Sequence, residues 1–203
     1  HLEDRPDSCA VVSQEFVLES LTGEEFSEDE LVAVAEENGW YTPGGGTAPA
    51  DMRKVIEAYG IETEQWESAS MSDLHAVLEA GGTPIVGVDA NEIWTPGFDG
   101  DDDSVIGDFP GYPGQDANHA VTVIGINESN GTVILNDSGH PEGRGEEVPF
   151  AEFEDAWADS NHLMVTAGPA ANAAVANATS LFGASSGTAL PRFGSSADDS
   201  NGW

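Results

Sequence analysis

Apolar residues in the first eighty positions recur at the three- and four-residue spacing of amphipathic helices. The pattern predicts four helices, and residues that commonly begin or end helices delimit them. The first begins at Cys9. The others run from a Ser27–Glu30 capping box to Asn38–Gly39, from Pro49 to about Tyr59, and from Ser70 or Ser72 to Gly81–Gly82.

The second part of the chain changes to short runs of β-branched residues, which favour strands. Strands are predicted over residues 84–89, 119–126, 132–137 and 162–167, with a short helix over 150–157. The two middle strands flank a turn and form a β-hairpin. Helices followed by an antiparallel sheet are the element order of an α+β fold. About 167 residues suffice for a core without disulfides or a metal.

Two segments interrupt these elements. Residues 39–49, rich in Gly and Pro, either connect two helices or form part of the wall of a cleft. Residues 90–118 form a longer loop that leads directly into His119, so we expect it to border a cleft. Its acidic run, residues 99–103, lacks the glycine and the closing glutamate of a calcium-binding loop.

Cys9 is the only cysteine of the chain and lies at the predicted start of a helix. Unpaired N–H groups and the helix dipole favour a thiolate at such a position. One cysteine cannot form a disulfide within the chain, so Cys9 serves either packing or chemistry.

His119 opens the predicted hairpin and Asp137 closes it, so antiparallel pairing brings both to the same end of the sheet. A carboxylate there can accept a hydrogen bond from one imidazole nitrogen and leave the other for a thiol. A cysteine on an N-terminal helix, then a histidine and an aspartate on successive strands, is the chain order of papain-like cysteine peptidases. This order favours chemistry over packing for Cys9.

The sequence resembles the bacteriocin-leader-processing, double-glycine peptidase branch of the papain superfamily, together with its stand-alone peptidase-like relatives. The matching pieces span most of residues 4–167. They are DSCAVVSQEFVLESLTG, SEDELVAVAEENGWYTPGGGTAPADMRKVIEAYGI, TPIVGV, HAVTVIGI, ILNDSG and PFAEFEDAW. The resemblance implies a papain-like fold, with N-terminal helices packed on an antiparallel sheet, and a peptide substrate. It also implies Cys9 as nucleophile, His119 as general base and acid, and Asp137 as the group that orients His119.

One position departs from the pattern of this family. A glutamine six residues before the cysteine usually donates a hydrogen bond to the oxyanion, and here Glu3 takes its place. An ionised carboxylate would repel a developing oxyanion, whereas a protonated one can donate. Gln14, five residues after Cys9, is interpreted as a structural residue of the helix. Two functions therefore stay open: an active cysteine peptidase, or a catalytically inactive papain-fold module that serves as a structural or binding component of an assembly or virion.

The chain is strongly acidic. It has 38 Asp and Glu against five Lys and Arg, a formal net charge of −33 on 203 residues. Such a chain repels nucleic acid, which excludes nucleic acid as a partner. Molar salt shortens the screening length to about 3 Å, so the acidity predicts a halophilic protein of archaeal or viral source. A hydrophobic fraction of 39% argues against reading the acidity as disorder.

Composition changes after a predicted domain of residues 1–167. Residues 168–203 are rich in Ala, Gly, Ser and Asn, which predicts a linker or tail. Scattered apolar residues in this tail suggest a contact with a neighbouring subunit, and therefore an oligomer or a larger assembly.

No metal or cofactor is predicted, because His75, His140 and His162 lack the spacing of zinc ligands. The chain as given has no run long enough to span a membrane and no signal peptide. Four N-x-S/T patterns fit an exported protein. An exported or virion-associated location is therefore favoured over a cytoplasmic one. The sequence does not distinguish export from association with a virion.

Overall fold

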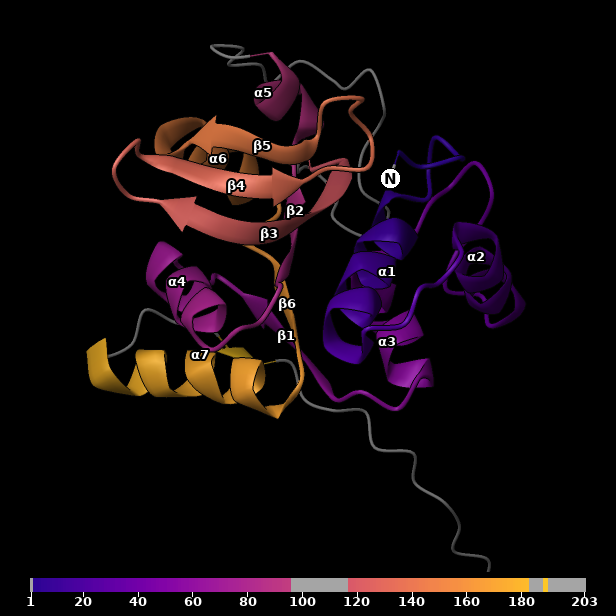
Figure 1. Ribbon diagram of the computed structural model, residues 1–203, viewed down its shortest axis with the longest axis horizontal. Helices are drawn as coiled ribbons and strands as arrows, with labels where there is room; N and C mark the ends of the chain where they lie inside the picture. The colour runs from indigo at the N-terminus through magenta and orange to yellow at the C-terminus, as the bar shows by residue number, and fades with distance from the viewer. Residues whose placement is uncertain (1, 96–116, 183–187, 190–203) are drawn as a thin grey trace, which may run out of the picture.

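An antiparallel sheet lies between two groups of helices in the computed structural model, which describes residues 2–95, 117–182 and 188–189 (Figure 1). The order of its seven strands is β5-β4-β3-β2-β6-β1-β7. The elements in chain order are α1 (Cys9–Thr22), α2 (Glu28–Glu37), η1 (Pro49–Asp51), α3 (Lys54–Ala58), β1 (Thr63–Glu67), α4 (Met71–Glu79), β2 (Ile85–Val88), α5 (Ala90–Trp94), β3 (His119–Asn127), β4 (Thr132–Asn136), β5 (Arg144–Pro149), α6 (Phe150–Ala158), β6 (Met164–Ala167), α7 (Pro169–Phe182) and β7 (Thr188–Ala189). The predicted α+β class is confirmed.

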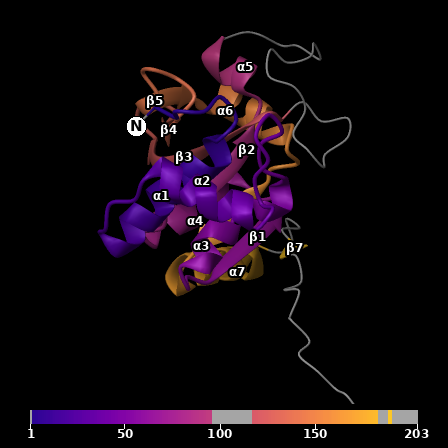
Figure 2. The ribbon, with the colours of Figure 1, turned by 90° about the vertical axis from the view of Figure 1, so that its right-hand side faces the viewer.

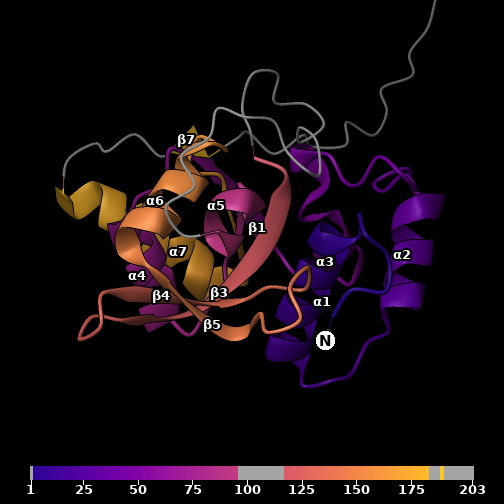
Figure 3. The same cartoon turned by 90° about the horizontal axis from the view of Figure 1, so that it is seen from above.

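Alternation of side chains along the central strands divides the apolar core into two layers. Ile85 and Val165 belong to the core shared with α1, α2 and α3, whereas Val86 and Met164 belong to the core shared with α4, α6 and α7. Seen from above, the two groups of helices lie on opposite sides of the sheet (Figure 3). Figure 2 looks onto the layer of α1, α2 and α3.

Helix α1 is the element that brings the N-terminal layer to the sheet. Val11, Val12 and Leu18 are fully buried, and the helix packs along β3. Ser13 Oγ donates a hydrogen bond to the carbonyl oxygen of Ala120 at 3.1 Å. Since Ser13 lies one turn after Cys9 and Ala120 directly follows His119, this bond holds the start of the helix beside the start of the strand.

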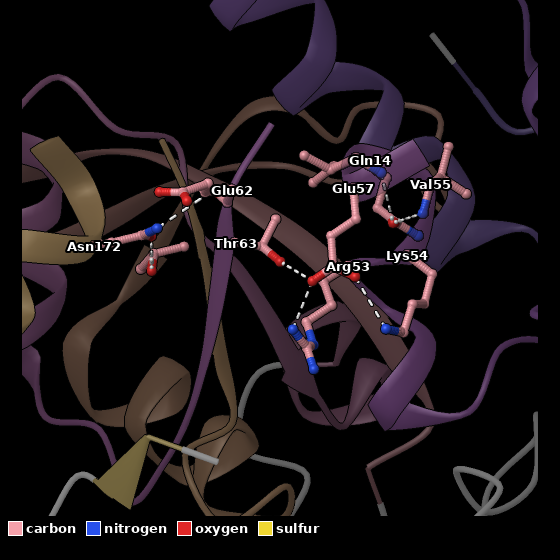
Figure 4. Close-up of polar contacts among 10 residues, drawn as sticks. Gln14, Arg53, Lys54, Val55, Glu57, Glu62, Thr63 and Asn172 are labelled. Carbon is pink, nitrogen blue, oxygen red and sulfur yellow. Dashed lines mark hydrogen bonds and ion pairs between the residues drawn. The ribbon is translucent and has the colours of Figure 1, made fainter. Parts of the chain in front are cut away.

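Polar side chains join the helices to strand β1 (Figure 4). The Glu57 carboxylate accepts hydrogen bonds from Arg53 at 2.6 Å, Lys54 at 3.0 Å and Thr63 at 2.7 Å. Burial alone would raise the pKa of Glu57, but these partners outweigh it and hold the pKa below its ordinary value. Two of the five Lys and Arg residues of the chain are therefore used at one carboxylate.

The predicted helices and strands are largely confirmed, with differences in detail. The helix expected over residues 49–59 is divided into η1 and α3. Helix α2 begins after Ser27, but the Ser27 side chain makes no capping hydrogen bond within the described residues, so the capping box predicted there is wrong. Ser70 does form a capping box, with Asp73 at the start of α4.

Strands β1 and β5 and helix α5 were not predicted, and each has a physical reason. Strand β1 has only one apolar residue, Trp66, among its five positions, and β5, an edge strand, has one buried residue, Val148. Helix α5 is five residues long and occupies the start of the segment predicted as a loop. Residues 96–116 of that segment, including the acidic run at 99–103, lie outside the described residues.

The segment predicted as a linker or tail begins with a helix. Helix α7 packs against α4 and β6, with Ala171 and Val175 buried in the core. Alanine is the strongest helix former, so an Ala-rich stretch can be helical when a surface is available to it. Residues 183–187 and 190–203 lie outside the described residues. The domain boundary after residue 167 stays a prediction.

Candidate active site

Cys9 is the first residue of α1, where the predicted helix begins. The residue is partly exposed. The preceding Ser8 is fully buried, and its hydroxyl donates to Arg5 O at 2.9 Å and to Glu28 Oε1 at 2.7 Å. These bonds fix the chain just before Cys9 against α2.

His119 lies at the start of β3 and Asp137 directly after β4. Thr122 pairs with Asn136, so the two residues lie at the same end of the hairpin, as predicted. Both are buried, and His119 Nε2 lies 2.6 Å from Asp137 Oδ1. Since Nε2 faces the carboxylate, Nδ1 is the ring nitrogen left for the side-chain hydrogen bond between His119 and Cys9. The structure thus brings Cys9, His119 and Asp137 together.

Electrostatics favour charge separation in this cluster. Burial alone would lower the pKa of His119, but the charges of Asp137 and Cys9 and their hydrogen bonds raise it well above 6.5. Burial alone would likewise raise the pKa of Asp137. The charge of His119 and the hydrogen bonds to the carboxylate outweigh burial, so this pKa lies below its ordinary value. An ionised Asp137 facing a charged imidazole is the favoured state.

Glu3 lies beside the same cluster. Its backbone N–H donates to Ser138 O at 2.9 Å, and its Oε2 accepts from Ser138 Oγ at 3.3 Å. Burial raises the pKa of Glu3 from 4.5 to about 7, with Asp137 and Glu28 raising it further and His119 and the Ser138 hydroxyl opposing them. The burial of Glu3 therefore favours the neutral form of its carboxyl.

Gln14 has the structural contacts expected of it. It is fully buried, and its Oε1 accepts hydrogen bonds from the backbone N–H groups of Val55 at 2.9 Å and Ile56 at 3.4 Å. Its Nε2 donates to Ala10 O at 3.1 Å. Gln14 therefore joins α1 to the first turn of α3 (Figure 4).

Two residues beside the cluster were not predicted as parts of the site. Trp94, at the end of α5, donates from Nε1 to Asp137 Oδ2 at 2.7 Å. Gly139 donates from its backbone N–H to Asp137 Oδ1 at 2.8 Å. In the sequence, Trp94 is separated from Asp137 by more than forty residues, and Gly139 stands out only as part of the ILNDSG match.

The Gly/Pro segment 39–49 is attached to the chain just before Cys9. Tyr41 donates from its hydroxyl to Asp7 Oδ1 at 2.6 Å, and the Gly44 backbone N–H donates to Asp7 Oδ2. Asp7 is two residues before Cys9. The segment thus connects α2 to η1 and also lies beside the start of α1.

Two of the hollows in the described part of the surface bear on the location of the site. One, of about 510 Å³, adjoins Asp137 and is lined by Leu2, Phe16, Glu19, His140 and Arg144, among others. The other, of about 630 Å³, lies between α4, α7 and the start of α6, and neither Cys9, His119 nor Asp137 lines it. The first hollow adjoins the cluster through Asp137, and neither Cys9 nor His119 is among its lining residues.

One group of acidic residues has the spacing of cation ligands. Carboxylate oxygens of Asp89, Glu92 and Asp159 lie within 4.8 Å of one another. Asp89 Oδ1 already accepts hydrogen bonds from the Asn91 backbone and the Asn118 side chain. Acidic proximity alone does not define a metal site.

The fold is similar to that of solved C39 peptidase domains and related proteases. A C39-like peptidase described as putative, from Bacillus anthracis, has a TM-score of 0.57 and 16% identity, covering 80% of this chain and 89% of that one. The peptidase domain of Streptococcus ComA, a bi-functional ABC transporter, has a TM-score of 0.54 and 16% identity, covering 83% and 96%. A double glycine motif protease from an AMS/PCAT transporter, in complex with its leader peptide, has a TM-score of 0.52 and 12% identity, covering 83% and 90%.

Sequence comparison agrees with the fold. The model of the Peptidase_C39 like family matches residues 1–165, so the chain belongs to that family. Uncharacterized proteins of Mycobacterium tuberculosis and Mycobacterium bovis are 32% identical over 183 residues, covering 78% of this chain and 75% of theirs. Among the described residues, no helix is long and apolar enough to cross a membrane.

Proposed function

We propose that this protein is a cysteine peptidase in which Cys9, His119 and Asp137 act as a triad. Cys9 transfers its proton to Nδ1 of His119, and its sulfur attacks the scissile carbonyl of a peptide. The imidazolium then protonates the leaving amine, and the neutral ring activates the water that hydrolyses the thioester. Asp137 orients the ring throughout and stabilises the imidazolium.

The observation that carries this proposal is the position of His119. Its ring lies between a carboxylate at 2.6 Å on Nε2 and the thiol of Cys9 on its other side. A buried histidine that served packing alone would need neither a carboxylate partner nor a hydrogen bond to a thiol. Membership of the Peptidase_C39 like family supports the same chemistry.

Glu3 is proposed as the side-chain donor to the oxyanion when its carboxyl is protonated. The raised pKa of about 7 supports a neutral carboxyl at and below neutral pH. The backbone N–H of Cys9 would be the second donor. The carboxyl of Glu3 can donate only when it is protonated, whereas the amide of a glutamine at the same position would donate at any pH. The reaction would therefore depend on the protonation of Glu3.

The proposed substrate is a peptide with small residues before the cleaved bond. This follows from the resemblance to double-glycine peptidases, and the leader peptide bound to one solved neighbour is a property of that protein. The charge of −33 supports a halophilic setting for the reaction. We also propose that copies of this chain associate with one another, or with a larger assembly, through residues 168–203.

An inactive binding module is the alternative, and one observation favours it. Glu3 stands beside Asp137 and Ser138, and once it is ionised its negative charge opposes an oxyanion. The two functions differ in what they require of Cys9. A module that only binds does not depend on the thiol or on its contact with His119.

Alkylation and cleavage in molar KCl test the proposal. Cys9 is the only thiol, so the mass added by iodoacetamide reports on it alone. We expect rapid alkylation of the folded protein at neutral pH, and cleavage of a peptide library that is lost in Cys9→Ala and His119→Ala. His75→Ala, on the exposed side of α4, is the matched histidine control and should cleave normally. A folded protein whose thiol is inert and which cleaves no peptide would support the inactive module.

A further inference from the structure

Helix α5 carries a side chain that reaches the cluster from outside the predicted triad. Trp94 donates its indole N–H to Asp137 Oδ2 at 2.7 Å. The other oxygen, Oδ1, receives His119 Nε2 at 2.6 Å and the Gly139 backbone N–H at 2.8 Å. Each carboxylate oxygen thus has its own donors. A carboxylate held at both oxygens cannot rotate away from the imidazole without losing a hydrogen bond.

The Trp94 ring also covers the histidine. Its centroid lies 5.4 Å from that of His119 in an edge-to-face arrangement. On its other side it stacks with His140 at 6.1 Å and an interplanar angle of 25°. An aromatic surface here keeps water from the His119–Asp137 hydrogen bond, which strengthens the bond because the local dielectric constant falls.

A buried amide fixes α5 relative to His119. Asn118, directly before His119, accepts from the Ala90 backbone N–H at 2.9 Å and donates to Asp89 Oδ1 at 3.0 Å. Its own backbone N–H donates to Val88 O at 3.1 Å. The residue that precedes the histidine therefore holds the helix that carries the tryptophan, so the two rings keep a defined relative position.

We propose that Trp94 is a positioning residue that fixes Asp137, so that His119 keeps its proton on Nε2 and presents Nδ1 to Cys9. The inference rests on the proposed peptidase function for its catalytic consequence. The hydrogen bond itself can be tested without any cleavage assay. Trp94 touches neither substrate nor thiol in this proposal and acts through Asp137.

Trp94→Phe is the direct test, because it removes the N–H donor and keeps an aromatic ring. Trp66→Phe is the matched control, since its indole also donates one hydrogen bond, to Thr166 at 3.1 Å, on a strand away from the cluster. We expect Trp94→Phe to lower kcat about tenfold with little change in KM, because the substitution removes one hydrogen bond to a charged group. Trp66→Phe should leave both constants unchanged.

Two measurements separate positioning from a merely structural role. The deshielded Nε2 proton of His119 in the NMR spectrum should broaden or move upfield in Trp94→Phe, and the pH dependence of Cys9 alkylation should shift. A Trp94→Phe protein that retains the wild-type proton signal and alkylation profile would overturn the inference. A wild-type protein that cleaves no peptide would refute the proposed function, while the proton signal would still decide the role of Trp94.

Should Trp94→Phe fail to fold, the wild-type protein gives the same test. An indole proton donated to an ionised carboxylate resonates downfield and exchanges slowly with solvent. A Trp94 indole proton that exchanges as rapidly as that of an exposed tryptophan would overturn the inference.

Discussion

Gly139 lies directly against the imidazole of His119: a β-carbon at this position would stand 2.9 Å from His119 Cε1. The same atom would stand 3.0 Å from Trp94 Cζ2, so neither ring has room to move aside into the other. Glycine is therefore required here for a close approach rather than for its backbone freedom.

Gly139→Ala is expected to displace His119 and lower kcat by about a hundredfold, since a displacement of about 1 Å at a reacting group has that effect. Gly125→Ala, in strand β3, is the control, because the nearest atom to its β-carbon would be Cδ1 at the flexible end of Ile134, at 3.3 Å. Steady-state kinetics and thermal unfolding of both variants make the measurement. Equal activity of the two would contradict the close approach.

The raised pKa of Glu3 predicts an unusual pH profile. A protonated donor is lost as pH rises through about 7, so kcat/KM of the wild type should fall above that value, about tenfold per pH unit. Glu3→Gln keeps a donor at every pH and should be about tenfold more active than the wild type at pH 8. The groups that bear on Glu3 are His119, Asp137, Glu28 and Ser138.

The stability of the same variant has a definite sign. Because the folded pKa of Glu3 lies above 4.5, its stabilising contribution is present below pH 4.5 and is lost as pH rises through about 7. The melting temperature of Glu3→Gln, relative to that of the wild type, should therefore increase as the pH rises from 4.5 to about 7. Parallel pH profiles of the two proteins would show that Glu3 does not ionise as proposed.

Gln14→Ala should destabilise the fold without altering the chemistry of Cys9. The substitution leaves the buried N–H of Val55 without its acceptor, which costs about 1–3 kcal/mol. Gln65→Ala is the matched control, because the buried Gln65 Oε1 accepts no hydrogen bond among the described residues. Chemical denaturation measures both losses. An equal loss for the two variants, or a slower alkylation of Cys9 in Gln14→Ala, would contradict the structural role.

The charge of −33 predicts that stability rises with salt. Surface carboxylates repel one another in dilute buffer, and KCl screens this repulsion. The melting temperature should climb steeply between about 0.1 and 3 M KCl, and mild acid near pH 5 should replace part of the salt. Trehalose at matched osmolarity is the uncharged control. A flat dependence on KCl would refute the halophilic setting.

The sequence predicted the elements that carry the candidate triad because each has a strong local pattern. His119 and Asp137 bound two apolar β-branched runs around a turn, so their common position follows from antiparallel pairing. Cys9 precedes a regular apolar helix pattern. The contact between Cys9 and His119 was supported by chain order and by resemblance rather than by any local pattern.

The contacts around the triad could not be predicted in the same way. Trp94 reaches Asp137 from a five-residue helix, too short for a periodic pattern, across more than forty residues. The partner of Gln14 is the backbone of α3, and because nearly every residue has a backbone N–H group, the sequence does not indicate which one Gln14 binds. The protonation of Glu3 depends on burial, which is a property of the folded chain.

The distance in sequence between the two parts of the cluster bears on synthesis of the protein. Cys9 leaves the ribosome more than one hundred residues before His119 and Asp137, and the central strand β6 follows later still. Domains fold as units once their long-range contacts can form. A growing chain therefore carries a thiol without its proposed base, and in the proposed peptidase cleavage could begin only when the sheet closes. Such a peptidase would spare its own nascent chain without needing an inhibitor.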